Sequence, residues 1–270
     1  MTSLEELAAR WPVDRVAAGV TNADGTLWTM GAVDWAPRIA SVSKLFVGMC
    51  ALIAMEELSI TLDDEAGPPG STVRHLLAHA SGLAFDGDVV LAPPATRRIY
   101  SNTGIERFAE HLAAATGIAF GEYLRLGVIE PLELEATSLR GSPAGSMHGS
   151  ITDLLTFGRE LLAPTLVSGE TMRMATEAHF PDLDGVVPEL GRYSPCPWGL
   201  TFELKHDKAP HWTGLTNAWE TFGHFGGTGS FLWVDPAAGL ACTALTDTEF
   251  GPWAMEHWPT FNDAVVARYA

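Results

Sequence analysis

The most apolar segment of the chain runs from Leu45 to Met55 and contains no charged or polar side chain. Apolar residues would occupy every side of a helix drawn through this run, which is typical of a helix that is buried all round. We therefore predict a buried helix that has Ser41 in its first turn and ends near Leu58. The run is too short to cross a bilayer, which takes about 20 apolar residues.

Shorter β-type patterns lie towards both ends of the chain. Two β-prone runs flank the turn signal Asn22-Ala23-Asp24-Gly25, which predicts a hairpin. After Pro197 the hydrophobic period again approaches two. The expected strands are residues 16–20, 26–31, 198–205, 229–234 and 239–246. Short helices are expected at 3–10 and at 259–269.

The middle of the chain has helical patterns instead. A loop rich in Gly and Pro precedes it at 63–71, and another loop follows at 182–197. The expected helices between them are residues 73–79, 104–115, 120–126 and 151–162. We predict an α+β fold, in which segments 1–71 and 186–270 share an antiparallel sheet flanked by the terminal helices. Residues 72–185 would form a helical insertion, with an active-site cleft between the two parts.

Composition and charge restrict the partners. The formal net charge of −17 disfavours binding to nucleic acid or to an anionic membrane. The N-terminal sequence is acidic and lacks the basic and apolar regions of a signal peptide. The three cysteines, 50, 196 and 242, are odd in number and widely spaced, which favours reduced thiols. We therefore expect a cytoplasmic protein.

Ser41 and Lys44 open the apolar helix, and their spacing places both side chains on the same face. Lys44 is one of only three lysines, against thirteen arginines. A buried amine avoids the cost of its charge by losing its proton, which an arginine cannot do, so Lys44 could serve as a base for Ser41. The ordinary alternative is a serine N-cap followed by a lysine that reaches solvent.

Signals for a metal or a cofactor are weak. His75 and His79 are four residues apart on an expected helix, but Leu76 stands where a zinc protease motif has glutamate. No Walker loop, Gly-x-Gly-x-x-Gly or Gly-x-Ser-x-Gly motif is present. We expect no metal and no cofactor, and a structural role for both histidines.

Two further stretches could carry chemistry. Tyr100-Ser101-Asn102 lies at the edge of the predicted insertion, although turn and cap chemistry would also explain it. Glycines in the stretch 222–229 would let a ligand approach the backbone closely, although a glycine-rich bulge is an equal explanation. Late tryptophans suit core packing better than an acyl pocket; they are Trp212, Trp219, Trp253 and Trp258.

Taken together and in chain order, these stretches resemble the serine β-lactamase and penicillin-binding-protein superfamily, most closely its class C-like branch of esterases, D-amino-acid peptidases and β-lactamases. Its Ser-x-x-Lys matches Ser41 to Lys44, its Tyr-x-Asn matches Tyr100 to Asn102, and its His-x-Gly matches His224 to Gly226. Supporting similarities are found at 72–83, 130–132, 151–154 and 232–240. The resemblance spans residues 16 to about 246.

The resemblance implies specific roles. Ser41 would be the acylated nucleophile, Lys44 its general base, and Tyr100 the proton relay to the leaving group and the deacylating water. The amides of Ser41 and Gly227 would form the oxyanion hole. The remaining residues would bind the substrate; they are Asn102, which also holds Lys44, together with His224 and Gly226.

The resemblance also leaves alternatives. His224 stands where many β-lactamases have a lysine for a substrate carboxylate, which favours an esterase or amidase. The prediction is a serine hydrolase that acts on a small ester or amide through an acyl-enzyme on Ser41. An acyltransferase that uses the same acyl-enzyme and a non-catalytic binding or sensing protein remain open. The sequence does not determine the oligomeric state.

Overall fold

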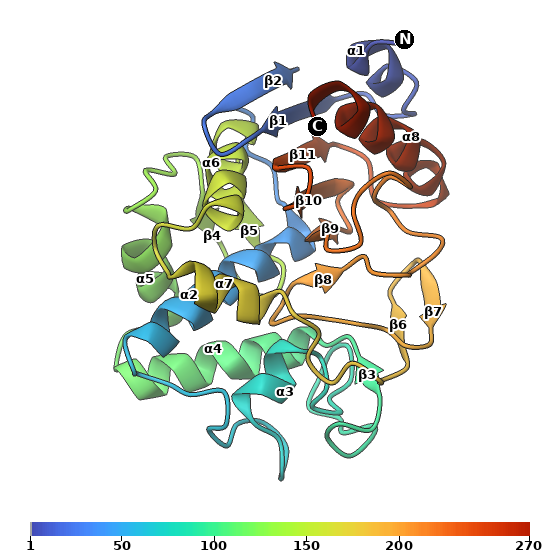
Figure 1. Cartoon of the computed structure of the whole chain (residues 1–270). Helices are drawn as coiled ribbons and strands as arrows, with labels where there is room; N and C mark the ends of the chain where they lie inside the picture. The colour runs from blue at the N-terminus through green and yellow to red at the C-terminus, as the bar shows by residue number, and fades with distance from the viewer. Residues whose placement is uncertain (1) are drawn as a thin grey trace.

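Both ends of the chain contribute to one central antiparallel sheet in the computed structural model, which describes residues 2–270 (Figure 1). The strand order is β2-β1-β11-β10-β9-β8. The strands are β1 (Val16–Thr21), β2 (Thr26–Met30), β8 (Glu203–Leu204), β9 (Phe222–Gly226), β10 (Ser230–Asp235) and β11 (Leu240–Thr246). β1 pairs directly with β11, with Val16 opposite Thr246. The predicted α+β fold with a shared antiparallel sheet is confirmed.

Helices cover both faces of this sheet, so its central strands β10 and β11 are buried on both sides. Helices α1 (Leu4–Ala8) and α8 (Pro252–Tyr269) pack on one face, where they meet Phe231 and Trp233 of β10. Leu232 and Val234 alternate to the other face and join the larger core. This alternation follows from the period of two along a strand.

Helix α2 (Ser43–Glu56) is the centre of the larger core, as the apolar run predicts. A one-turn 3₁₀ helix, η1 (Ala40–Val42), precedes it and carries Ser41. Gly48 lies against Thr201 so closely that a Cβ atom would overlap the Thr201 hydroxyl. The loop that leads into β8 is therefore packed directly on α2.

The middle segment is mostly helical, as expected. Its helices are α3 (Val73–Leu77), α4 (Asn102–Thr116), α5 (Phe120–Leu124), a π-helical stretch η2 (Arg125–Ile129), α6 (Ile151–Leu162) and α7 (Gly169–Ala175). α6 lies on the sheet: Ile151 and Leu155 contact Gly19, and Gly158 contacts Ala241. Although α6 belongs to the predicted insertion, it covers one face of the sheet. The division of the chain at residues 72 and 185 stays a prediction.

Five short strands lie in and just after the middle segment. A second sheet has the order β3 (Arg98–Ile99), β6 (Gly185–Val187) and β7 (Gly191–Tyr193), and β4 (Ser138–Leu139) pairs with β5 (Met147–His148). Within residues 2–270, no single helix is long and apolar enough to cross a bilayer.

Several predicted elements differ in extent. The helix expected at 3–10 is α1, and the helix expected at 73–79 ends at Leu77, so that His79, with a left-handed φ of 54°, lies beyond it. The strand expected at 198–205 is reduced to β8, because Thr201 adopts a left-handed backbone conformation with φ of 70° that interrupts an extended chain. The first strand after the loop at 182–197 and β8 is not the one expected at 229–234. Residues 222–226 of the glycine-rich stretch already form a strand, β9. The last helix begins at Pro252 rather than at Pro259, because proline suits the first helical position and Pro259 is tolerated inside a helix anchored by Trp258 and Phe261.

Candidate active site

Ser41 lies where the 3₁₀ turn meets α2, and Lys44 lies in the first turn of α2. The Lys44 Nζ atom is 3.2 Å from Ser41 Oγ, within hydrogen-bonding distance. Ala40, just before Ser41, has a left-handed φ of 46°, a strained conformation for a residue with a side chain. The chain thus holds the serine at a constrained corner rather than in regular helix.

Lys44 is fully buried, and three oxygens surround its amine. Nζ donates to Asn102 Oδ1 at 2.7 Å and to the Ala144 carbonyl at 2.6 Å, in addition to the Ser41 contact. Burial lowers the pKa of Lys44 from 10.5 to about 7. A substantial fraction of the amine is therefore unprotonated near neutral pH and can accept the Ser41 proton.

Two acidic residues limit this fall in the pKa of Lys44. The charges of Asp86 and Glu106 favour the ammonium form and raise the pKa of Lys44 in part. Asp86 also accepts a hydrogen bond from the Asn102 amide at 3.1 Å. Glu106 accepts one from the Ser142 hydroxyl, which itself accepts from the Ala144 amide, so the loop that contacts Lys44 is anchored.

His224 and Tyr100 form the second half of the site. His224 Nδ1 is 2.6 Å from the Phe225 carbonyl, so this nitrogen carries the proton. The other nitrogen, Nε2, then accepts from the Tyr100 hydroxyl at 3.2 Å. Burial and the nearby Lys44 lower the pKa of His224 to about 3, so the ring is neutral at physiological pH.

The Tyr100 side chain is buried between aromatic rings and Lys44. Its ring lies 4.8 Å from Lys44 Nζ, 4.5 Å from the His79 ring and 5.7 Å from the Trp198 ring. Burial raises the pKa of the Tyr100 phenol, and a hydrogen bond with the Ser41 side chain offsets part of that rise. Tyr100 is therefore a neutral phenol in contact with both halves of the site.

Gly226, the last residue of β9, packs directly on the turn that carries Ser41. A Cβ atom on Gly226 would overlap the Ile39 carbonyl and the Ser230 hydroxyl, so only glycine fits there without a shift. Gly227 is exposed, with no atom near the place a Cβ would occupy, and its carbonyl accepts from the Phe250 amide at 3.0 Å. Gly226 thus packs on the turn that carries Ser41, and Gly227 is the next residue of the chain.

The structure brings the predicted residues of three distant stretches into one cluster. Ser41, Lys44, Tyr100, Asn102 and His224 are linked by the contacts described above. Sequence reasoning missed the Ala144 carbonyl and the charge of Asp86. A backbone acceptor leaves no trace in residue type, and an acidic residue in an exposed loop resembles any other surface charge.

His75 and His79, the two histidines considered as metal ligands, each accept a different backbone hydrogen bond. His75 Nδ1 accepts from the Thr72 amide at 3.2 Å and so caps α3. His79 is buried, and its Nδ1 accepts from the Ser101 amide at 3.2 Å, next to the Tyr100 ring. Within residues 2–270, no group of three or more His, Cys, Asp or Glu side chains is arranged to hold a metal ion.

Comparison with known proteins assigns the family. A family model for beta-lactamases matches residues 13–267, nearly the whole chain. The chain belongs to the beta-lactamase family. A solved beta-lactamase from Mycobacterium bovis is 47% identical, with 99% of both chains covered and a TM-score of 0.97. The resemblance drawn from the three stretches is confirmed.

More distant structures of this beta-lactamase fold have other functions. A mutant simvastatin synthase from Aspergillus terreus is 18% identical, with a TM-score of 0.78 and coverage of 98% of this chain and 94% of that one. A D-stereospecific amidohydrolase from Streptomyces is 20% identical, with a TM-score of 0.71 and coverage of 94% and 96%. These similarities show the shared fold alone. A search of curated proteins found no match.

Proposed function

We propose that this beta-lactamase family member is a serine hydrolase that cleaves a small ester or amide through an acyl-enzyme on Ser41. The observation that carries the proposal is the pair formed by Ser41 Oγ and Lys44 Nζ, 3.2 Å apart, with the pKa of the amine lowered to about 7. A base whose pKa lies near the working pH takes up a proton most effectively.

Acylation transfers the Ser41 proton to Lys44 while Oγ forms a bond to the substrate carbonyl carbon. The Ser41 and Gly227 amides would stabilise the oxyanion. Ser41 lies in the first turn of a helix, where amides have no partner within the helix, and Gly227 directly follows β9. When the carbon–oxygen or carbon–nitrogen bond breaks, Tyr100 gives its proton to the leaving group and regains one from the Lys44 ammonium. The enzyme is then acylated and otherwise restored.

Deacylation uses the same groups with water in place of the leaving group. The Tyr100 hydroxyl, which donates to His224 in the resting site, must turn towards the reacting atoms to exchange its proton. Because His224 is neutral and buried, it can accept from Tyr100 and hold substrate, but it offers no cation to an anionic group. This supports an ester or a neutral amide as the group cleaved.

The setting of this activity is also proposed. Three buried cysteines with free thiols suit a reducing cytoplasm. The net charge of −17 supports a small-molecule partner rather than nucleic acid or an anionic membrane. The acylation and deacylation steps given above use only side chains and backbone amides of the protein, without a metal or a cofactor.

The test compares Ser41→Ala with Ser43→Ala on p-nitrophenyl acetate. Ser41→Ala should lower kcat/KM to background, because no acyl-enzyme can form. The Ser43 hydroxyl points elsewhere: it donates to the Ala40 carbonyl at 2.5 Å and accepts from the Met147 amide at 3.1 Å. Ser43→Ala should therefore keep turnover and lose about 1–3 kcal/mol of stability. Full activity of Ser41→Ala would refute the proposal.

A further inference from the structure

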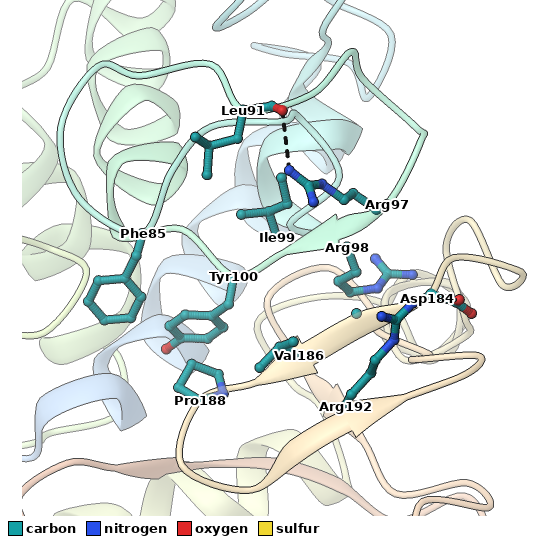
Figure 2. Close-up of a pocket in the computed structure, with 11 residues that line it drawn as sticks. Phe85, Leu91, Arg97, Arg98, Ile99, Tyr100, Asp184, Val186, Pro188 and Arg192 are labelled. Atoms are coloured by element: carbon teal, nitrogen blue, oxygen red, sulfur yellow. Dashed lines mark hydrogen bonds and ion pairs between the residues drawn. The ribbon is translucent and has the colours of Figure 1, made fainter.

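A pocket of about 440 Å³ lies beside Tyr100, between the loop that precedes β3 and the β6–β7 hairpin (Figure 2). Its volume is in the range of small-molecule sites. Tyr100 is the one residue of the site cluster that lines it, so a ligand here would adjoin the reacting groups. The lining residues are Phe85, Leu91, Arg97, Arg98, Ile99, Tyr100, Asp184, Gly185, Val186, Pro188 and Arg192.

The walls of this pocket hold large apolar side chains that the fold leaves exposed. Phe85, Leu91 and Val186 are 47%, 51% and 53% exposed. They are three of the ten exposed large hydrophobics within residues 2–270, and Ile99 and Pro188 add apolar surface to the same pocket. Apolar residues gathered on one concave surface indicate a binding site rather than scattered surface residues. The ligand should therefore be apolar along most of its length.

Arginines stand at the other end of the pocket from Phe85 and Tyr100 (Figure 2). The Arg97 guanidinium donates to the Leu91 carbonyl at 3.2 Å and forms no ion pair within the described residues. Arg192 pairs with Asp184 at 3.3 Å, but its side chain is 73% exposed and keeps other donors free. Both guanidinium groups can thus bind an anion.

Arg98 adds a buried positive charge to the same wall. Its guanidinium donates only to backbone carbonyls, which are those of Ala78, His179, Phe180 and Cys196. No carboxylate within residues 2–270 pairs with it, so its charge is not neutralised locally. Three of the chain's thirteen arginines therefore line one pocket of a protein whose net charge is −17.

We propose that this pocket is the substrate-specificity site and selects an apolar chain that ends in a carboxylate. The chain would lie along Phe85, Leu91 and Val186, and the carboxylate would bind Arg97 and Arg192. This inference rests on the proposed hydrolase function and names its substrate class. It also accounts for the neutral His224, because the anion-binding groups would then lie away from β9, at the far end of the pocket.

The experiment uses two matched pairs of esters, because the apolar chain of the substrate can lie in the acyl part or in the alcohol part of the ester. One pair varies the acyl part: p-nitrophenyl hexanoate and the mono-p-nitrophenyl ester of adipic acid. The other varies the alcohol part: p-tolyl acetate and 4-acetoxyphenylacetate. In one of the pairs, the wild type should prefer the carboxylate member in kcat/KM by about tenfold or more.

Arg97→Gln combined with Arg192→Gln should lower kcat/KM for the carboxylate ester to about that of the uncharged ester and so remove that preference. Both positions are exposed, so the variant should keep the wild-type melting temperature. Arg10→Gln combined with Arg173→Gln is the charge-matched control, since both arginines are exposed and neither lines the pocket. No preference in either pair, or a preference that the double variant keeps, would overturn the inference. Loss of all ester turnover only in Ser41→Ala would leave the hydrolase proposal standing in either case.

Discussion

The Lys44 amine is buried, and its three hydrogen-bond partners are all oxygen atoms. Burial favours the neutral amine, whereas the oxygens and the charges of Asp86 and Glu106 favour the ammonium. The resulting pKa of about 7 is a balance of these opposing effects. At the scale of single residues, this balance decides whether Ser41 can be deprotonated at neutral pH.

The pH profile of kcat/KM should report this balance. Activity should rise as pH increases through about 7 and level off above it, because only the neutral Lys44 amine accepts a proton. His224 should add no second limb between pH 5 and 8, since its pKa is lowered to about 3. Initial rates with p-nitrophenyl acetate between pH 5 and 9 measure the profile. A flat profile would contradict the assignment of Lys44 as the base.

Asp86→Asn should move this rise to lower pH. The Asp86 carboxylate stabilises the Lys44 ammonium, so its removal lowers the pKa of Lys44 and leaves more neutral amine at acidic pH. The shift should be a few tenths of a pH unit, because Asp86 is exposed and its field is screened. Asp63→Asn, an exposed carboxylate that pairs with Arg74, is the control. A shift of the profile to higher pH would contradict the prediction that Asp86 stabilises the Lys44 ammonium.

At the scale of elements, the site depends on the contact between β9 and the 3₁₀ turn that carries Ser41. Gly226 lies against Ile39 and Ala40, and the Ser230 hydroxyl donates to the Ile39 carbonyl at 2.9 Å. These contacts hold the left-handed backbone of Ala40 in place. The geometry of Ser41, the proposed nucleophile, is therefore set partly by a strand far away in the sequence.

Alanine substitutions at the neighbouring glycines 226 and 227 test this packing effect. Gly226→Ala should lower both stability and activity, because the added methyl overlaps backbone and must displace β9 from the turn. Overpacking of this kind costs about 1–3 kcal/mol, or roughly 2–12 °C in melting temperature. Gly227→Ala should fold normally, because nothing lies near its Cβ position. Thermal melts and ester turnover of both variants test this, and equal stability loss in the two would contradict it.

The residues that cluster around Ser41 could be predicted more fully from the sequence than the elements around them. The three stretches around Ser41, Tyr100 and His224 could be found because their chemistry requires particular residue types in a fixed order. The start of α8 and the extent of β8 could not be found, because Pro259 and the left-handed Thr201 are set by tertiary packing. The Tyr100 pocket was also missed, since exposed apolar residues form a surface only once the chain is folded.

At the scale of the whole molecule, a buried ionic cluster joins the loop after β8 to the sheet. Glu203 accepts from Lys208, from His211 at 2.8 Å and from Trp212 at 3.0 Å. Lys208 also lies 5.2 Å from the Trp198 ring, which packs on Tyr100. The cluster thus supports one wall of the site from behind.

Glu203→Gln should destabilise the whole protein by about 3–5 kcal/mol, because it leaves the Lys208 charge buried without a counterion. Burial raises the pKa of Glu203, but His211 and Lys208 outweigh burial and hold it below its ordinary value of 4.5. The stabilisation is therefore complete above pH 4.5 and is lost as pH falls below it. Denaturation curves of both proteins should differ most near neutral pH and converge in acid. A constant difference down to pH 2 would contradict this account.

Intact mass spectrometry after treatment with a fluorophosphonate tests directly whether Ser41 is the nucleophile. The wild type should gain one adduct, Ser41→Ala should gain none, and the wild type should also turn over p-nitrophenyl acetate steadily. An adduct without turnover would favour an acyltransferase or a binding protein that shares the acyl-enzyme chemistry. An adduct of equal yield on Ser41→Ala, or none on the wild type, would contradict the assignment of Ser41 as the nucleophile.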